Sequence, residues 1–335
     1  MKDALKDANL PRTAEGRFQH LGVRPGEVAN RIVTVGSAPR AHTLASLLDE
    51  KPAPFKLASE RGFLTITGRY KGVPMSIVCI GMGAPNLDFF VRECRECVVG
   101  DMAIVRLGSC GGLLDTQPGT VVVPRACVSV WRNVDFDFAG TDEEDAEGAY
   151  MISKPVIADQ DLHDRVQAAL EAVRPADWPA PVLGEVVNAS ADSFYSSQGR
   201  QTSFPDHNAG LIARLLKEVE GLTTLEMETF HLYHLAHSWG LKRTLPVKPS
   251  IADAAGSTKS NDANLAESGA RVAEPDTVIR VAAAQIVFAS RSSRAFVSPE
   301  RVGQVERWAG MGVLNALAGV EIERAHPEQG SAWAL

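Results

Sequence analysis

Two glycine-rich segments of this sequence carry an arginine, and each follows an apolar run that predicts a buried strand. In GSAPR, Gly36 opens the segment and Arg40 closes it; in VRLGSCGG, Arg106 precedes the glycines and Ser109 lies among them. Glycine amides and guanidinium groups are the donors that an oxyanion requires, and open α/β sheets bind ligands where their strands end. Plain turns are the alternative. Neither these segments nor GMGAP at 81–85 match a dinucleotide fingerprint or a P-loop.

The segment DSFYSSQGR places Gln198 and Arg200 two residues apart in a predicted loop. One edge of uracil presents an acceptor, a donor and an acceptor (O2, N3–H and O4). A glutamine amide and a nearby arginine supply groups complementary to that edge. Phe194 offers a ring that can stack on a base or lie beneath a sugar. A solvated polar loop is the simpler alternative, and the sequence leaves both open.

The run LEMETF at 225–230 reads as the opening of a helix. Acidic residues are favoured there because they complement the helix dipole. Alternatively, one of the two carboxylates points into a pocket and accepts hydrogen bonds from the vicinal 2′- and 3′-hydroxyls of a ribose. Sequence alone favours neither.

Two other patterns suggest a metal site only superficially. His231, His234 and His237 stand at three-residue steps on a predicted helix, whereas helical ligands usually stand four apart with a third ligand elsewhere. Cys94 and Cys97 form a C-x-x-C with no second pair. We therefore predict neither a metal nor a cofactor.

Strands are predicted to alternate with helices around these segments. Strands are expected within 31–40, 63–85 (a hairpin turning at Lys71 and Gly72), 102–112 (ending in a glycine-rich loop), 119–130, 184–195 and 277–290. Helices are expected over 41–50, 87–100, 161–173, 208–221, 227–240 and 301–320. This alternation predicts a single α/β domain over residues 1–335, with a central mixed, largely parallel β-sheet flanked by helices. A polar N-terminal arm at 1–19, an exposed acidic loop at 138–149 and an inserted loop at 241–275 complete the expected organisation.

The composition is that of an ordinary globular protein, with 335 residues, 45% of them hydrophobic, and a net charge of −7. No basic field is present to bind nucleic acid. The sequence shows no secretory signal core and no apolar run long enough to cross a membrane. Five cysteines without a disulfide-scaffold pattern indicate a reducing compartment. A cytoplasmic location is therefore expected.

Taken in order, GSAPR, KLASERGF, GMGAP, VRLGSCGG, SFYSSQGR and LEMETF, with HLGV at 20–23, resemble the uridine phosphorylase branch of the nucleoside phosphorylase superfamily. Single motifs are weak, but the ordered set is specific. The resemblance implies the three-layer fold of that superfamily and phosphorolysis of uridine, with inorganic phosphate as co-substrate, in nucleoside salvage or catabolism. Ser290 and Arg291 stand where purine enzymes of the superfamily carry a catalytic aspartate, which favours a pyrimidine.

The resemblance also implies roles for individual residues. For phosphate it implies Gly36, Arg40, Arg106 and Ser109, with Arg61 donated by the neighbouring subunit. For the base it implies Gly111, Phe194, Gln198, Arg200 and Arg291, with Arg294 as the alternative to Arg291. For the ribose it implies Met227, Glu228 and a His20 that reaches across from the other subunit. The implied catalytic set is Arg40, Arg61, Arg106 and Glu228.

Since two of these residues act across a subunit boundary, a homo-oligomer of at least two subunits with shared active sites is expected. The expected ligands are a nucleoside and phosphate, with no nucleic-acid or membrane partner. Two alternatives remain. One is a purine nucleoside phosphorylase or a nucleosidase of the same superfamily. The other is a non-catalytic nucleoside-binding or storage protein, because fold does not determine function.

Overall fold

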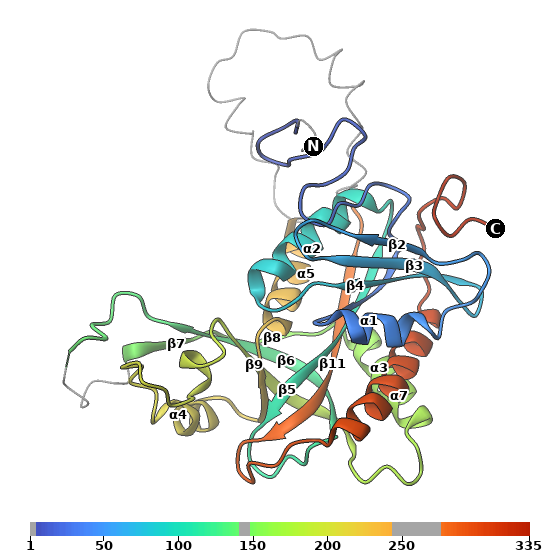
Figure 1. Cartoon of the computed structure of the whole chain (residues 1–335). Helices are drawn as coiled ribbons and strands as arrows, with labels where there is room; N and C mark the ends of the chain where they lie inside the picture. The colour runs from blue at the N-terminus through green and yellow to red at the C-terminus, as the bar shows by residue number, and fades with distance from the viewer. Residues whose placement is uncertain (1–4, 141–147, 243–275) are drawn as a thin grey trace, which may run out of the picture.

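A computed structural model describes residues 5–140, 148–242 and 276–335 of the chain (Figure 1). The core of the acidic stretch, 141–147, and most of the expected inserted loop, 243–275, lie outside the described residues, as do residues 1–4. The strands are β1 (Arg31–Val35), β2 (Phe55–Ala58), β3 (Leu64–Tyr70), β4 (Val73–Cys79), β5 (Met102–Gly112), β6 (Val121–Arg132), β7 (Tyr150–Ile152), β8 (Val156–Ile157), β9 (Val182–Ala191), β10 (Leu222–Glu226) and β11 (Ile279–Ser290). The helices are α1 (Ala38–Ala45), α2 (Ala84–Cys97), α3 (Gln160–Val173), α4 (Leu211–Glu218), α5 (Thr229–Lys242) and α7 (Pro299–Ala318), with a 3-10 turn, η2 (Ser196–Gln198).

The described strands form one mixed sheet in the order β10-β9-β6-β11-β5-β1-β4-β3-β2, with β7 and β8 paired to β6. Its central strands β4, β1, β5 and β11 run parallel, and so do β6, β9 and β10. The end of β5 also pairs antiparallel with β10, through Gly111 and Leu225. Together with the β11–β6 pairing, this closes β5, β11, β6, β9 and β10 into a ring.

Helices cover both faces of the central strands (Figure 1). Val105 and Leu107 of β5 pack in the core with α1, α3 and α7, whereas Met102 and Ile104 pack in the core with α2 and α5. Successive side chains of a strand point to opposite faces, so a strand covered on both faces is apolar along most of its length. This explains the largely apolar runs that predicted the central strands.

The mixed α/β fold predicted from the sequence is confirmed, but two local predictions were wrong. The segment GSCGG is not a loop, because β5 continues to Gly112 and its Ser109 pairs with Ile286 of β11. Nor does LEMETF open a helix, because Leu225 and Glu226 end a strand and α5 begins only at Thr229. The short strands β2, β7, β8 and β10 were not predicted.

Candidate active site

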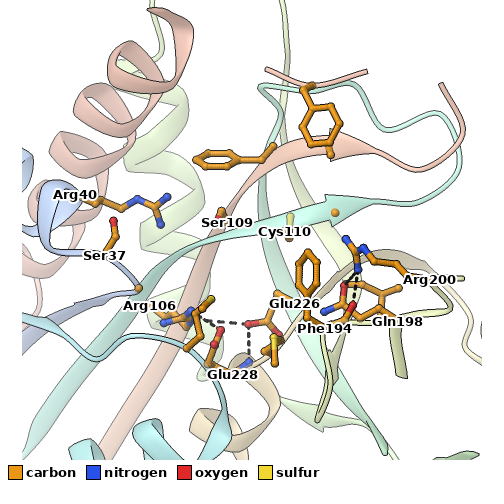
Figure 2. A pocket seen from close by; sticks show the side chains of 18 of the residues that line it. Ser37, Arg40, Arg106, Ser109, Cys110, Phe194, Gln198, Arg200, Glu226 and Glu228 are labelled. Carbon is orange, nitrogen blue, oxygen red and sulfur yellow. Dashed lines mark hydrogen bonds and ion pairs between the residues drawn. The ribbon is translucent and has the colours of Figure 1, made fainter. Parts of the chain in front are cut away.

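A cavity of about 440 Å³ lies where β1, β5, β10 and β11 end (Figure 2). It is lined by most of the residues that the sequence singled out: Gly36, Arg40, Arg106, Ser109, Gly111, Phe194, Gln198, Arg200, Met227 and Glu228. These residues come from four segments that are far apart in the chain. The fold therefore brings the separate motifs to a single place.

Arg106 and Glu228 form a buried ion pair in the wall of this cavity (Figure 2). Nη2 of Arg106 donates to Oε2 of Glu228, and each side chain is only 4% exposed. The other carboxylate oxygen accepts a hydrogen bond from the backbone N–H of Gly83, whose φ is +94°. Glycine adopts such a conformation at little cost, which explains the second glycine of GMGAP. Burial raises the pKa of Glu228, the Arg106 charge opposes this shift, and the Glu226 carboxylate adds to it.

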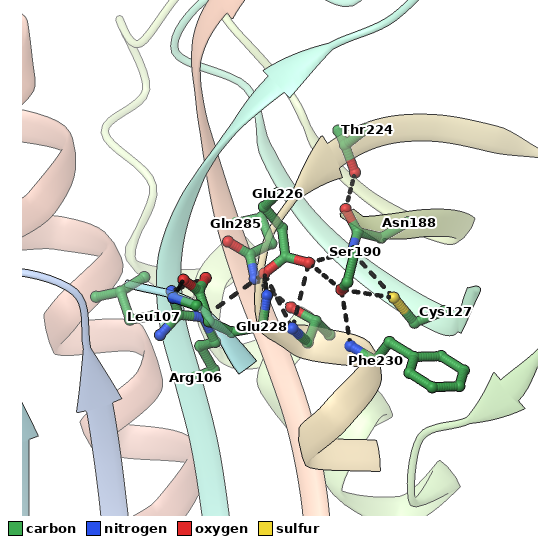
Figure 3. A network of polar contacts seen from close by, with 12 residues as sticks. Arg106, Leu107, Cys127, Asn188, Ser190, Thr224, Glu226, Glu228, Phe230 and Gln285 are labelled. Atoms are coloured by element: carbon green, nitrogen blue, oxygen red, sulfur yellow. Dashed lines mark hydrogen bonds and ion pairs between the residues drawn. The ribbon is translucent and has the colours of Figure 1, made fainter. Parts of the chain in front are cut away.

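Glu226 caps the start of α5 and fixes the backbone that carries Glu228 (Figure 3). Its carboxylate accepts hydrogen bonds from the backbone N–H groups of Glu228 (2.9 Å) and Thr229 (3.0 Å). The side chains of Asn188 (2.7 Å) and Ser190 also donate to it. It thereby satisfies N–H groups that the first turn of a helix leaves free. Glu226 thus caps α5, and Glu228 lines the cavity. The contact of a carboxylate with ribose hydroxyls stays a prediction.

Arg40 reaches the cavity from α1 and faces Ser109 (Figure 2). Its Nε donates to Oε1 of Glu306 on α7 at 2.8 Å, and its Nη1 donates to the backbone oxygen of Leu107 at 3.3 Å. Burial lowers the pKa of Arg40, the Glu306 carboxylate opposes this shift, and the charge of Arg106 lowers it further.

We call the part of the cavity lined by Gly36, Arg40, Arg106 and Ser109 the anion corner. It combines two guanidinium groups, a hydroxyl and a glycine backbone. A Cβ added at Gly36 would lie 3.3 Å from the backbone oxygen of Gly81 and 3.9 Å from Nη2 of Arg106. Guanidinium groups and a closely approaching backbone are suited to an oxyanion.

The opposite end of the cavity is formed by Phe194, Gln198 and Arg200, which we call the Gln–Arg corner (Figure 2). Nη1 of Arg200 donates to Oε1 of Gln198 and to the backbone oxygen of Phe194. The Arg200 guanidinium carbon lies 3.9 Å from the centre of the Phe194 ring. Within the described residues, Nε2 of Gln198 has no hydrogen-bond partner. This corner thus presents a free amide donor beside a cation.

Two further contacts shape the Gln–Arg corner. The side-chain amide of Asn208 donates to backbone oxygens on either side of Gln198, at Ser196 (2.8 Å) and Arg200 (3.1 Å), and so holds the loop in place. Burial, and secondarily the charge of Arg291, lower the pKa of Arg200 to about 10. That value keeps its guanidinium positively charged at neutral pH.

Three of the predicted residues do not line the cavity of the single chain. Arg61 is exposed in the turn between β2 and β3. His20 pairs with Glu93 (Nδ1 to Oε1, 2.6 Å), and its ring stacks on Phe89 with 3.8 Å between centroids. Arg291 contacts the segment that carries the Gln–Arg corner, where its Nη2 donates to the backbone oxygen of Gly199 at 3.1 Å. Arg61 and His20 were expected to act in the neighbouring subunit, so their positions here leave that expectation open.

Sequence reasoning assigned no role to several residues of the cavity wall: Ser37, Met82, Cys110, Leu225, Phe296 and Glu306. Ser37 could have been found, because it belongs to GSAPR. Glu306 gave no signal, since 265 residues separate it from the arginine that it contacts. Burial raises the pKa of the Cys110 thiol well above its usual value, which makes it unsuited to act as a nucleophile.

Among residues 5–140, 148–242 and 276–335, no group of three or more His, Cys, Asp or Glu side chains is arranged to hold a metal ion. No helix in this part of the chain is both long and apolar enough to cross a membrane.

Comparison with known proteins identifies the family. A family model described as the phosphorylase superfamily matches residues 30–285. The chain belongs to the phosphorylase superfamily. A superfamily structure from work on two diverse uridine phosphorylases of the oomycete Phytophthora capsici is 37% identical, covers 95% of this chain and 100% of that one, and has a TM-score of 0.78. The superfamily and fold predicted from the sequence are therefore confirmed.

Other members of the superfamily are less similar. A uridine phosphorylase of Thermococcus kodakarensis is 29% identical over 249 residues, which are 72% of this chain and 80% of that protein. A DeoD-type purine nucleoside phosphorylase of Streptococcus suis is 27% identical over 225 residues, 67% of this chain and 81% of that protein. The structure of a Trypanosoma brucei nucleoside phosphorylase, 19% identical with a TM-score of 0.69 over 93% of this chain and all of that one, shares the fold.

Proposed function

We propose that this protein catalyses the phosphorolysis of uridine to uracil and ribose 1-phosphate. The observation that carries the proposal is the layout of one cavity, with the anion corner at one end, the Gln–Arg corner at the other and Glu228 between them (Figure 2). From one end of the cavity to the other, phosphate, ribose and base would each contact side chains of suitable chemistry. Two relatives described as uridine phosphorylases, at 37% and 29% identity, support this choice of substrate.

The anion corner is proposed to hold phosphate against C1′ of the ribose. A phosphate oxygen forms a bond to C1′ while the bond from C1′ to N1 of uracil breaks, and the electron pair of that bond leaves with uracil. Phosphate is a weak nucleophile, so Arg40, Arg106, Ser109 and the backbone at Gly36 act mainly by positioning it. The negative charge of the bound phosphate stabilises the positive charge that develops on the sugar.

The leaving base is proposed to bind at the Gln–Arg corner. Gln198 and Arg200 complement the edge of uracil and stabilise the negative charge that it acquires. Phe194 and Gly111 also line the cavity, and Arg291 adds positive charge through its hydrogen bond to the same segment at Gly199. No strong general acid is needed if these groups take up the charge.

The ribose is proposed to lie against Met227 and Glu228. The Glu228 carboxylate accepts hydrogen bonds from the 2′- and 3′-hydroxyls while it stays paired with Arg106. This pairing connects the group that orients the sugar to a group that binds phosphate.

The complete site is proposed to need a second subunit. Arg61 of the partner subunit would add a third cation for phosphate, and His20 of the partner subunit would contact the 5′-hydroxyl. The working unit is then at least a homodimer with shared active sites. The five cysteines are all free and buried, which supports a reducing, cytosolic location and a role in nucleoside salvage or catabolism.

The test is a uridine assay followed at the uracil absorbance, with and without phosphate. The proposal expects uracil release that depends on phosphate, and faster turnover of uridine than of inosine. Release without phosphate would identify a nucleosidase. Equal or faster turnover of inosine would favour a purine nucleoside phosphorylase. This is the second candidate function, because the Streptococcus suis relative at 27% identity is described as such an enzyme. Uridine binding without turnover in phosphate would identify a binding or storage protein.

A further inference from the structure

Glu306 brings a carboxylate from α7 into the anion corner. It lines the cavity together with Gly36, Arg106 and Ser109, and its Oε1 lies 2.8 Å from Nε of Arg40. The side chains of Arg40 and Glu306 are 4% and 12% exposed, so the pair is largely removed from water. A negative charge is thus built into the place where the proposed function requires an anion to bind.

The contact with Glu306 orients the Arg40 guanidinium. Glu306 engages Nε, the backbone oxygen of Leu107 engages Nη1, and Nη2 makes no hydrogen bond among the described residues. Two anchored nitrogens define the plane of a guanidinium group, because its N–H donors form a rigid fork. The third nitrogen is left available for a ligand.

Glu306 differs from Glu228, the carboxylate that partners the other arginine of the corner. Glu228 also accepts a hydrogen bond from the Gly83 backbone and lies against the capped start of α5. Within the described residues, Glu306 makes a hydrogen bond or ion pair only with Arg40. Its charge can therefore be removed without breaking a wider network, provided that an acceptor for Nε remains.

The negative charge of Glu306 opposes the binding of phosphate at this position. Glu306 can approach a phosphate bound to Arg40 within a few ångströms, in an environment that screens charge less than water does. Two like charges at such a distance repel each other. The carboxylate also partly neutralises the positive charge with which Arg40 would attract an anion.

We propose that Glu306 is a positioning residue that orients Arg40 by its hydrogen bond and, by its charge, weakens phosphate binding and so sets the phosphate concentration range in which the enzyme works. This inference rests on the proposed function, because it names phosphate as the occupant of the anion corner.

The experiment compares Glu306→Gln with Glu306→Asp. Glutamine keeps an oxygen that can accept from Arg40 Nε but removes the charge. The KM for phosphate at saturating uridine should therefore fall by roughly fivefold or more, because a like charge beside the anion is removed. The KM for uridine should change much less. Glu306→Asp retains the charge and should not lower the KM for phosphate. Glu300→Gln makes the same charge change at an exposed position in the first turn of α7 and should leave both constants as in the wild type.

A binding measurement without uridine separates this inference from the proposed function. Inorganic phosphate should raise the melting temperature of Glu306→Gln at lower concentrations than it does for the wild type, even if uridine proves not to be the substrate. An unchanged or raised phosphate requirement in Glu306→Gln overturns the inference. So does an equal improvement in Glu306→Asp or Glu300→Gln, because the effect would then not come from the charge at position 306.

Discussion

At the scale of single residues, Arg106 interacts with two carboxylates. Glu228 is hydrogen bonded to one end of its guanidinium, and Glu226 lies 3.7 Å from its Nε. None of the three side chains is more than 4% exposed, so two negative charges and one positive charge are buried together. Such an imbalance is unfavourable unless hydrogen bonds or further cations compensate for it. The donors that surround Glu226 supply part of that compensation, and Arg40 adds a second positive charge in the same corner of the cavity as Arg106.

We predict that Arg106→Ala lowers kcat/KM for uridine by about 3 kcal/mol or more, because removal of one charge-stabilising donor typically has an effect of that size. Steady-state kinetics at saturating phosphate measure it. Arg125→Ala is the matched control, since Arg125 lies on β6, outside the cavity, and is 46% exposed. Near-native kinetics in a folded Arg106→Ala protein would remove Arg106 from the mechanism.

We also predict an acid limb in the pH profile of kcat/KM for uridine, with a midpoint above the usual glutamate pKa. Burial raises the pKa of Glu228, and its protonated form can neither pair with Arg106 nor accept both ribose hydroxyls. Activity should therefore fall as the pH decreases through the raised value.

Stability should change in the opposite direction over the same window. Because the folded-state pKa of Glu228 is raised, its contribution to stability is fully present below the unfolded-state pKa and is lost as the pH rises through the folded-state value. Glu228→Gln should have lower activity and lack this acid limb. A limb that persists unchanged in the variant would assign the titration to another group.

At the scale of elements, the sequence located the segments that line the cavity better than it located the strands that hold them. Arg40, Arg106, Gln198 and Arg200 were found because glycines and paired polar residues after apolar runs are local signals. The five-residue strand β10 was missed because its last two residues, Leu225 and Glu226, belong to the LEMETF run, which resembles a helix start.

Long-range pairing limits such predictions further. The GSCGG segment contains three glycines, which locally favour a loop, yet its residues pair with β11 on one side and, at the end, with β10 on the other. The contact between Arg40 and Glu306 likewise depends on how α7 packs beside α1. Neither effect has a counterpart in the nearby sequence.

Gly108 gives a prediction at this scale. A Cβ there would lie 2.2 Å from Oε1 of Gln285, which is fully buried and donates from Nε2 to Oγ1 of Thr229 at 2.6 Å. The glutamine cannot move aside without breaking this bond between β11 and α5. Gly108→Ala should therefore lower the free energy of unfolding by about 1–3 kcal/mol, as overpacking typically does.

Gly111→Ala is the control for Gly108→Ala in denaturant unfolding. It lies on the same strand, and its nearest contact for a new Cβ, the backbone oxygen of Leu225, is 4.0 Å away. Its unfolding free energy should stay close to that of the wild type, whatever happens to substrate binding. Equal stability of the two variants would show that Gln285 can adjust without loss.

On the scale of the whole molecule, the single chain supplies two of the three cations proposed for phosphate. Arg40 and Arg106 line the cavity, whereas Arg61 is exposed in a turn outside its wall. His20 likewise does not line the cavity of its own chain. The completion of each site by a second subunit stays a prediction.

Subunit complementation tests the shared site. Arg61→Ala and Arg106→Ala proteins should each be nearly inactive. In a mixed dimer, one site combines an intact Arg106 with an intact Arg61 from the other subunit, and the second site lacks both. When equal amounts of the two variants exchange subunits freely, half of the dimers are mixed and each mixed dimer has one complete site. About one quarter of all sites should therefore be active. No recovery, despite subunit exchange verified by differently tagged chains, would place both arginines in the same subunit's site.

The continuity of β5 has a consequence for how this enzyme can evolve. Arg106 and Gly111 lie on one unbroken strand, about 17 Å of backbone end to end at the usual rise per residue. Loop movement cannot stretch or shorten that interval. A change in the spacing between these two residues would require an insertion or deletion inside a paired strand, which shifts every later side chain to the other face. The sheet therefore fixes the position of Gly111 relative to Arg106, and changes in base specificity should arise in the separate segment that carries Phe194, Gln198 and Arg200.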